Sequence, residues 1–460
     1  MDTHQPPSPY EPVDEARLNR FHWRSLFTTG MGVLTDGYDL SSVGIVLPLA
    51  LASFHQHSLT GVESSLLAGS ALVGSAVGAL AFGFAANRGR KRFYGLDVTI
   101  MALAALAQAF APSITWLIAI RFILGIGVGA DYVLSPMILG EHANRRDRGK
   151  IMALGFGLTW TVGAVIASML YLILEGAGVA PDLVWRIVLA AGALPAASVI
   201  YLRRRLPETP RFLLAIRRDP TAYAAVAREA SGDRVAPPTR LGLNEDLKSF
   251  FARRWPAVLA ACSLWFLFDI VAYSGILFGP SLIAKGIGLT PGTFNLAMEL
   301  VATIPGAIVG LSLVDRVGRR WMQALGFAGM AAFLVMFAAA HAAIAAAPLV
   351  GALVYGGVNF SQQAGPGSIS ASGLLGVELS STRARGLVQA LTVASGRLGA
   401  SLTSFVFPAL FATWGEDAAL VFLAGVAILA LAITLLAVPE TARRTLEENA
   451  GELLPAGAAD

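Results

Sequence analysis

The chain has 460 residues, of which 55% are hydrophobic and only 14% are charged, and its formal net charge is +4. A soluble domain carries about 25% charged residues, and no single soluble core absorbs this much apolar sequence. The composition therefore excludes a soluble protein and predicts a helical membrane protein. The only cysteine, Cys262, excludes an internal disulfide framework.

Apolar segments follow one another along almost the whole chain. Residues 1–21 are polar, contain no segment typical of a signal peptide, and are predicted to form a tail. Each later apolar segment has about 20 residues, the length that crosses a ~30 Å hydrocarbon layer. The fold class predicted is an all-α membrane protein with twelve transmembrane helices, at 22–50, 65–86, 94–113, 115–140, 150–175, 183–204, 254–284, 292–315, 320–344, 346–377, 384–413 and 416–439.

Three motifs occur twice at nearly the same separation. They are "NRGRKR" and "DRVGRR" from residues 87 and 315, "EHANRRDRG" and "ELSSTRARG" from residues 141 and 378, and "PETPRFL" and "PETARRTL" from residues 207 and 439. Such a repeat predicts two homologous six-helix bundles, 22–204 and 254–440, joined by a partly helical linker at 205–253 and followed by a tail at 441–460. Parallel halves around a midplane site are the architecture of alternating-access transporters.

Basic residues gather in every second connection between the predicted spans. The positive-inside rule then places both termini in the cytoplasm, and we expect a multi-pass protein of the plasma membrane. The basic clusters are Arg88, Arg90, Lys91 and Arg92; Arg145, Arg146, Arg148 and Lys150; Arg203, Arg204, Arg205, Arg211, Arg217 and Arg218; Arg316, Arg319 and Arg320; Arg383 and Arg385; and Arg443 and Arg444.

These motifs resemble those of the major facilitator superfamily. The segment "GFAANRGRKR" from Gly83 is similar to the signature G-x-x-x-D-R-x-G-R-K of that superfamily, with Asn87 in place of the usual aspartate. The segment "RFILGIGVG" from Arg121 is similar to its fourth-span glycine pattern, whose glycines permit close helix approach. The PET motifs resemble those of sugar porters and of their phosphate-symporter relatives.

Three further segments resemble the phosphate:proton symporter branch of that superfamily. They are "TDGYDL" from Thr35, "GADYVLSP" from Gly129 and "WFLFDIVAY" from Trp265. The resemblance implies proton transfer by Asp131 and by Asp36 or Asp39. It also implies a substrate site that includes Tyr132, Trp265, Asp269 and Tyr273. The glutamine that this branch carries in span 5 falls on Leu154, and its span-10 asparagine has no clear counterpart.

Depth and spacing agree with a central polar site. With a rise of about 1.5 Å per residue, the acidic residues and Arg397 fall near the middle of their helices. Charged groups at that depth are stable only where they face a cavity or one another. Asp36 and Asp39 share one helical face, and Trp265, Asp269 and Tyr273 form a stripe on another. Gln362 and Gln363, beside the break Gly365–Gly367, are further candidates to bind a polar substrate.

Purely structural roles remain alternatives for some of these residues. Trp265 and Tyr273 could be packing residues, and Asp131 could form a fixed ion pair with Arg397. Gate pairs on the cytoplasmic side, including an Asp315–Arg316 pair, are predicted to steer conformation. The predicted gate residues are Arg88, Arg90, Glu141, Arg148, Asp315, Arg316, Arg319, Glu378 and Arg385.

The function predicted is secondary active transport, with protons coupled to a small polar solute. No zincin, P-loop or metal-ligand motif indicates an enzyme, a cofactor or a metal site. Inorganic phosphate or an organic anion is favoured because Arg397 suits an anion. The alternatives are a symporter or uniporter of a sugar or another neutral metabolite, and a non-transporting membrane sensor. The expected partners are the solute, protons and the bilayer; a monomer is expected, with no nucleic acid.

Overall fold

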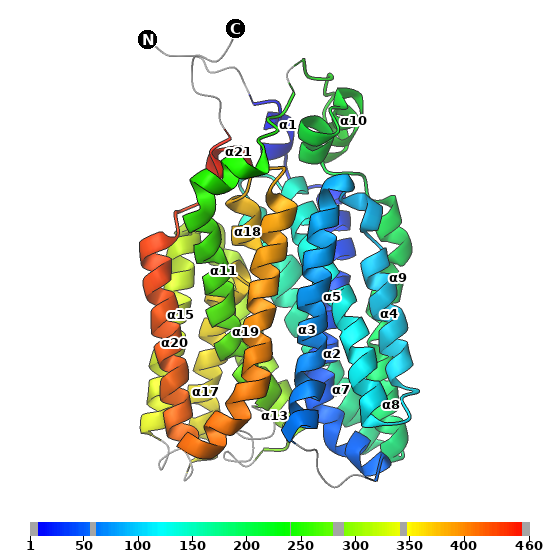
Figure 1. The fold of residues 1–460 in the computed structure, drawn as a ribbon, viewed down its shortest axis with the longest axis vertical. Coiled ribbons are helices and arrows are strands. Elements are labelled where there is room, and N and C mark those ends of the chain that lie inside the picture. Colours follow the sequence, from blue (N-terminus) through cyan, green and yellow to red (C-terminus); the bar gives the residue numbers. More distant parts are fainter. Residues whose placement is uncertain (1–7, 56–60, 240, 279–288, 341–346, 453–460) are drawn as a thin grey trace.

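The computed structural model describes residues 8–55, 61–239, 241–278, 289–340 and 347–452, and within them the chain is helical without strands. The predicted ends of the spans 254–284 and 320–344, the first residue of 346–377 and the outermost parts of both tails lie outside these residues. Figure 1 shows a bundle of long, roughly parallel helices, with both termini at one end. That end is called the termini face below.

The first bundle contains six membrane spans. They are α2 (Arg20–Ser53), α3 (Gly61–Ala85), α4 (Leu96–Gln108), α5 (Ile114–His142), α6 (Arg148–Met152) continuing through η3 (Ala153–Leu158) into α7 (Thr159–Gly176), and α8 (Pro181–Ala191) with α9 (Ala193–Arg205). Span 3 is shorter than the predicted 94–113, since Gly95 adopts a left-handed conformation directly before α4.

The second bundle repeats this arrangement. Its spans are α11 (Leu247–Phe278), α13 (Pro291–Met298) with η6 (Glu299–Thr303) and α14 (Ile304–Val317), α15 (Arg319–Ala339), α17 (Pro348–Gln362) with η7 (Gln363–Gly367), α19 (Arg385–Trp414) and α20 (Glu416–Ala437). Helix α11 begins at Leu247, before the predicted 254, so part of the predicted linker is helix.

Short helices cover the termini face. They are α1 (Glu11–Asp14), the turns η1 (Ala86–Arg88) and η2 (Lys91–Phe93) between α3 and α4, the linker elements η4 (Phe212–Ile216) and α10 (Pro220–Ser231), α18 (Leu374–Glu378) and α21 (Leu446–Ala450). In Figure 1, α1, α10 and α21 lie beside the ends of the long helices at this face.

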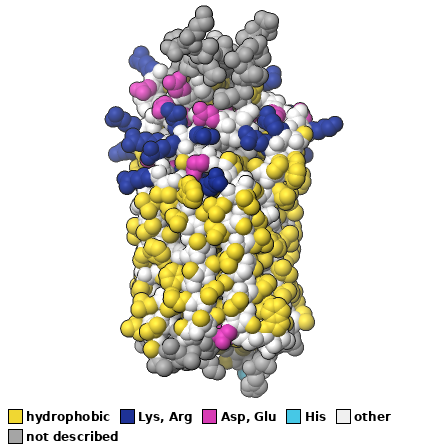
Figure 2. Space-filling model, turned by 90° about the vertical axis from the view of Figure 1, so that its left-hand side faces the viewer, with side chains coloured by type: hydrophobic (Ala, Val, Ile, Leu, Met, Phe, Trp, Pro, Cys, Tyr) yellow, Lys and Arg dark blue, Asp and Glu magenta, His cyan; other side chains and the backbone are white. Residues whose placement is uncertain are grey.

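The surface agrees with a membrane protein that crosses the bilayer many times. In the described part of the chain, nine helices are long and apolar enough to span a bilayer, and the twelve-span architecture is consistent with them. Figure 2 shows a broad hydrophobic belt, with Lys and Arg side chains gathered toward the termini face. A belt of this kind faces lipid tails, because exposed apolar area on this scale is not stable in water.

Glycines bring neighbouring helices close, as the sequence predicts. A Cβ atom at Gly125 would lie 2.0 Å from the carbonyl oxygen of Ala71, and one at Gly129 would lie 1.9 Å from that of Ser75. Helices α3 and α5 therefore pack backbone against backbone. Helix α3 also packs against α19, which joins the two bundles.

Candidate functional site

A small cavity lies between the two bundles. Its volume is about 50 Å³, which is room for a few water molecules or a small solute. Helix α5 and the η3–α7 segment line it from the first bundle, and α11, η7 and α19 line it from the second. The lining residues include Tyr132, Phe156, Gly157, Trp160, Trp265, Phe268, Asp269, Tyr273, Gln362, Gln363 and Arg397.

The Arg397 side chain, on α19, is the cationic centre of this site. Its guanidinium lies 3.7 Å from the Asp36 carboxylate of α2 and 3.8 Å from the Asp269 carboxylate of α11. It also donates a hydrogen bond to the Tyr273 hydroxyl and lies 4.4 Å from the ring centroid of Tyr132. All five side chains are buried. The sequence prediction thus selected residues that the structure brings together.

The two carboxylates differ in their hydrogen bonds. Asp36 Oδ2 accepts from the Tyr132 hydroxyl at 2.8 Å and from the Trp160 indole at 3.1 Å. Asp269 Oδ2 has no hydrogen-bond partner among the described residues, and its nearest cation is Arg397. Ionised Asp36 is therefore better solvated by the protein than ionised Asp269, so Asp269 loses less when it binds a proton.

Aromatic and amide side chains form the remaining walls. The Trp265 ring is buried 6.2 Å from the Tyr132 ring, and a Cβ atom at Gly396 would collide with it at 2.3 Å. The glycine at 157 makes room for Gln363, since a Cβ atom there would lie 2.8 Å from Gln363 Nε2. Trp265, Gln362 and Gln363 therefore contact the cavity as the sequence predicted.

Sequence reasoning missed Trp160. The η3–α7 segment places Gly157 and Trp160 at the cavity, while Leu154, where a polar residue was expected, is not part of its lining. The π-helical turn at Ala153–Leu158 changes which side chains face inward. A π-turn leaves no periodic signal in an apolar segment, so only the structure could reveal it.

Asp39 lines a second, smaller cavity together with Asp36 and Arg397. Its carboxylate pairs with Arg121 at 3.0 Å and accepts from the Gln108 side chain at 2.9 Å. All three residues are buried within the first bundle. Asp39 lies three residues beyond Asp36, about 60° away around the helix axis, so its carboxylate also meets Arg121 of α5.

Asp131 pairs with Arg203, and the ion pair expected with Arg397 is wrong. The Arg203 guanidinium lies 2.6 Å from Asp131 and 2.7 Å from Asp97, and all three side chains are buried. The Arg203 guanidinium also lies 4.3 Å from the ring centroid of Tyr94. The sequence assigned Arg203 to a basic loop and overlooked Asp97. A second site with two acids around one guanidinium therefore lies inside the first bundle.

Gly32 leaves space for this second cluster. A Cβ atom at Gly32 would lie 2.2 Å from Asp131 Oδ2 and 2.3 Å from an Arg203 nitrogen. Asp131 Oδ2 has no hydrogen-bond partner among the described residues. That oxygen therefore faces the space that Gly32 leaves without a side chain.

One buried ion cluster joins the bundles at the termini face. The Glu141 carboxylate of α5 lies 2.8 Å from Arg90 and 2.7 Å from Arg385, and the second arginine belongs to the other bundle. Arg90 also donates to the carbonyl oxygen of Thr382 across the interface at 2.8 Å. These side chains are fully buried, so the contact is closed to water.

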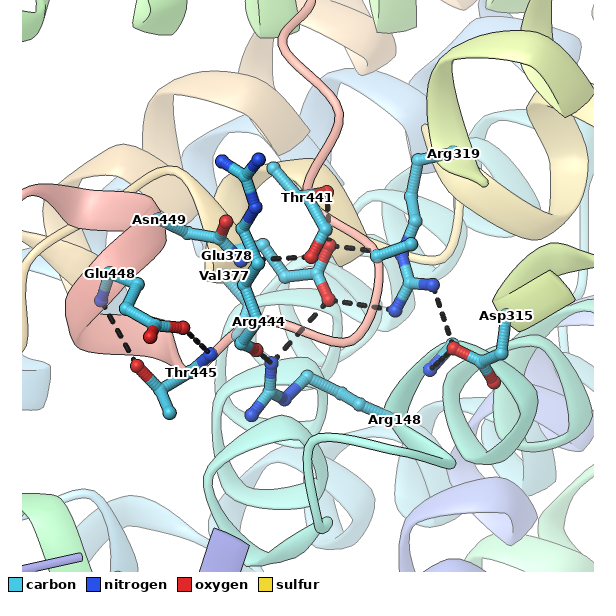
Figure 3. A network of polar contacts seen from close by, with 12 residues as sticks. Arg148, Asp315, Arg319, Val377, Glu378, Thr441, Arg444, Thr445, Glu448 and Asn449 are labelled. Atoms are coloured by element: carbon cyan, nitrogen blue, oxygen red, sulfur yellow. Dashed lines mark hydrogen bonds and ion pairs between the residues drawn. The ribbon is translucent and has the colours of Figure 1, made fainter. Parts of the chain in front are cut away.

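A second cluster repeats this arrangement in the other half (Figure 3). Glu378 lies 2.9 Å from Arg319 of its own bundle and 3.6 Å from Arg148 of the first bundle. Asp315 pairs with Arg319 and accepts from the backbone N–H groups of Gly149 and Lys150 at 3.1 and 2.6 Å. The two clusters hold the bundles together on the face that carries the termini.

Two of the predicted gate residues stand apart from these clusters. Arg88 and Arg316 are exposed. The expected Asp315–Arg316 pair is wrong, because Asp315 binds Arg319, one helical turn further along. Asn87 donates a hydrogen bond to the carbonyl oxygen of Arg383 at 2.7 Å, so it too bridges the bundles.

Both tails and the linker meet at a third cluster that sequence reasoning missed. Arg211 of the linker is buried and lies 2.7 Å from both Asp14 and Glu447. Burial raises the pKa of Asp14, and Arg211 opposes that rise only in part. Burial alone would also raise the pKa of Glu447, but the Arg211 guanidinium outweighs it and the pKa lies below its usual value. The repeated PET motif was the available signal, since Arg211 belongs to its first copy.

The C-terminal end of the described chain contacts Thr382, the residue whose carbonyl oxygen accepts from Arg90. Glu452 accepts a hydrogen bond from the Thr382 backbone N–H at 3.0 Å. Burial raises the pKa of Glu452 to about 7 even though Arg385 is nearby. Among the described residues no group of three or more His, Cys, Asp or Glu side chains is arranged to hold a metal ion.

Comparison with known proteins decides the family. A family model described as "Sugar (and other) transporter" matches residues 26–452. The chain belongs to this family. Its members are transporters and not enzymes.

Several family members are similar over nearly their whole length. A probable inorganic phosphate transporter 1-10 of Oryza sativa subsp. japonica is 32% identical, with 95% of this chain and 91% of the relative covered. The probable inorganic phosphate transporter 1-6 of Arabidopsis thaliana is 30% identical, with 96% of each covered. The inner membrane metabolite transport protein YgcS of Escherichia coli (strain K12) is 32% identical, with 93% and 94% covered.

Solved structures share the transporter fold. The major facilitator superfamily proton:xylose symporter XylE, bound to 6-bromo-6-deoxy-D-glucose, superposes with a TM-score of 0.78 at 20% identity. The comparison covers 94% of this chain and 99% of XylE. At that identity the likeness establishes the fold of this family member.

Proposed function

We propose that this transporter is a proton-coupled symporter of a small anion, inorganic phosphate or an organic anion, that works by alternating access. The observation that carries the proposal is the buried Arg397 guanidinium between the Asp36 and Asp269 carboxylates. Arg397 lines two adjacent small cavities, one with Asp269 and one with Asp36. An arginine is well suited to bind phosphate or carboxylate, because its planar fork matches their oxygens.

Charge balance links the anion to protons. With both carboxylates ionised, the site carries one positive and two negative charges, an excess of one negative charge in a buried space. A bound monoanion adds another negative charge, and one proton that is taken up with it leaves the net charge of the site unchanged. Because an unbalanced charge at this depth costs several kcal/mol, anion and proton binding favour each other.

The hydrogen bonds assign roles within this scheme. Asp269 has the poorest partners and takes the proton that accompanies the anion. Asp36 remains the acceptor for Tyr132 and Trp160 and fixes Arg397. Asp131 and Asp97 share Arg203 in the second cluster, which we propose as a further proton-holding site. Asp39 serves to fix Arg121.

Substrate contacts follow from the lining of the cavity. Arg397 and the Tyr273 hydroxyl bind the anion, and Gln363 and Gln362 donate or accept hydrogen bonds at the opposite wall. Tyr132 and Trp265 contribute flat apolar walls. The names of the plant relatives favour inorganic phosphate, whereas the aromatic lining suits an organic anion equally well.

We also propose an orientation and a division into domains. The termini face lies in the cytoplasm of a plasma-membrane protein, since basic side chains gather there. The bundles 22–204 and 254–440 move relative to each other about the cavity, with 205–253 as the linker and 1–21 and 441–460 as tails. A monomer suffices because the cavity is built from one chain. The buried Glu141 and Glu378 clusters keep the cytoplasmic gate closed in this state.

Transport by purified protein in proteoliposomes tests the proposal. Uptake of labelled phosphate, of a panel of labelled carboxylates and of labelled sugars is compared with and without an inward proton gradient. We expect one anion class to accumulate only with the gradient. Arg397→Lys should retain part of that uptake and Arg397→Gln should lose nearly all of it, because only the first keeps a cation.

Asp269→Asn separates coupling from binding. We expect exchange of pre-loaded anion to continue while accumulation driven by the gradient disappears. The control is Asp182→Asn, which removes an equal charge from an exposed pair with Arg186. Gradient-driven uptake of a sugar, with its affinity intact in Arg397→Gln, would refute the anion assignment.

A further inference from the structure

A large groove opens on the termini face of the first bundle. Its volume is about 960 Å³, and its walls are the α3–α4 connection, the end of α9 and the linker elements η4 and α10. Five lining residues are basic, one is acidic and several are apolar: Arg88, Lys91, Arg92, Arg204 and Arg217; Glu208; and Leu96, Phe212, Leu213 and Val226.

The basic side chains of the groove lack carboxylate partners. In the described part of the chain, Arg88, Lys91, Arg92 and Arg204 have no Asp or Glu oxygen within 4.0 Å. Of the five basic residues in the groove, only Arg217 has one, the Asp219 carboxylate at 3.9 Å, and the Arg217 side chain is exposed. A cluster of like charges without counter-ions repels itself and attracts an anion.

The acid in the groove does not neutralise these cations. The Glu208 carboxylate accepts from the backbone N–H of Lys91 at 3.2 Å and from that of Thr209 at 3.0 Å. Burial raises the pKa of Glu208. Its role is to hold the α3–α4 connection against the linker, and the groove keeps a strong excess of positive charge.

Lipid-facing side chains lie at the edge of the groove. Leu96, the first residue of α4, lines the groove and is 50% exposed. Tyr201 is 59% exposed on α9, three residues before Arg204, and Phe84 is 66% exposed on α3, four residues before Arg88. Residues at these spacings lie one helical turn apart, so the basic groove borders the hydrophobic belt.

We propose that this groove binds the phosphate headgroup of an anionic phospholipid from the leaflet at the termini face. The unpaired arginines and the lysine bind the phosphate oxygens, and the acyl chains extend along Leu96 and the exposed side chains below it. Basic pockets between transmembrane helices recognise anionic headgroups in this way. The apolar edge favours a lipid over free phosphate, because only a lipid has acyl chains that contact apolar side chains.

The groove shares a wall with the gate. The Phe212 ring lies in the groove wall, and the Arg90 guanidinium lies 5.2 Å from its centroid. Asn87, next to Arg88, holds the carbonyl oxygen of Arg383 in the other bundle. Both contacts exist while the termini face is closed. A lipid that orders the α3–α4 connection therefore stabilises the closed gate.

Native mass spectrometry of the delipidated full-length protein tests the site. Dioleoyl phosphatidylglycerol, dioleoyl phosphatidylcholine and inorganic phosphate are titrated separately, and phosphate is also added in excess to the phosphatidylglycerol complex. The groove variant is Arg92→Gln/Arg204→Gln. The control is Arg316→Gln/Arg443→Gln, which removes two exposed charges from the same face of the second bundle.

We expect one tightly held phosphatidylglycerol molecule in the wild type and in the control. The groove variant should bind it at least tenfold more weakly, since each basic residue near an anionic headgroup contributes about fivefold. Equal retention of phosphatidylcholine, an equal loss in the control, or unchanged binding in the groove variant would overturn the proposal. Displacement of the lipid by millimolar inorganic phosphate would assign the site to free phosphate instead.

Discussion

Glu141 is the residue whose removal should most directly open the gate. Its carboxylate is buried between Arg90 and Arg385, at 2.8 and 2.7 Å. The three groups carry a net charge of +1 in the closed state. Glu141→Gln raises this to +2, because two guanidinium groups then lie close together in a buried space without a counter-ion.

The size of the effect follows from burial. Removing one partner of a buried ion pair costs about 3–5 kcal/mol, since the remaining charge stays desolvated. In the open state both arginines reach water, so the penalty applies only to the closed state. A loss of 3 kcal/mol changes the equilibrium between the two states by roughly a hundredfold. If about 99% of the wild-type molecules are in the closed state, the closed and open states would then have similar populations in the variant.

Distances between spin labels measure this shift. Labels at Arg146→Cys and Arg316→Cys, exposed positions of the two bundles, are read out by pulsed electron resonance in a Cys262→Ala background. We expect a second, longer distance in Glu141→Gln that the parent chain does not show.

A matched control removes the same group from an exposed pair. Glu229 lies 2.8 Å from Arg24, and both side chains are nearly half exposed. Such a pair contributes about 0–1 kcal/mol, so Glu229→Gln should leave the distances unchanged. If Glu141→Gln gives the same distance distribution as this control, the buried cluster does not hold the gate.

Three other predictions concern the interior, the packing and the tail. Asp131→Asn should abolish proton-driven accumulation in proteoliposomes but leave exchange partly intact; full uphill uptake would exclude it from coupling. Gly37→Ala should lower the free energy of unfolding by about 1–3 kcal/mol, because its Cβ atom would lie 2.0 Å from the Trp160 carbonyl oxygen. The control Gly425→Ala should not lower it, because no atom lies within 4 Å of the added Cβ atom. Burial raises the pKa of Glu452 from its usual value near 4.5 to about 7, so its favourable contribution to the free energy of unfolding is complete below pH 4.5 and is lost as the pH rises through 7. Glu452→Gln should therefore melt at a higher temperature than the wild type at pH 8 and at a similar temperature at pH 5; equal melting curves at pH 8 would contradict this.

Partners across helices were the hardest contacts to infer. Arg203, Arg204 and Arg205 form one basic run, which suggested a loop in the sequence. In the structure they lie on α9, where successive side chains point about 100° apart. Arg203 therefore faces Asp97 and Asp131, whereas its two neighbours are exposed.

The sequence by itself determined the membrane class, the helical fold with its twelve spans, and the mid-depth positions of Asp36, Asp269 and Arg397, whereas Tyr132, Trp265 and Tyr273 came from the family resemblance. Hydrophobic length, repeated motifs and the cost of a charge at mid-depth are local properties, and they can be read along the chain. Only the tertiary structure decided which acid faces which arginine. The rotation of each helix, the π-turn before Trp160 and the folding of both tails onto Arg211 depend on packing between segments far apart in the sequence, which spacing along one helix does not encode.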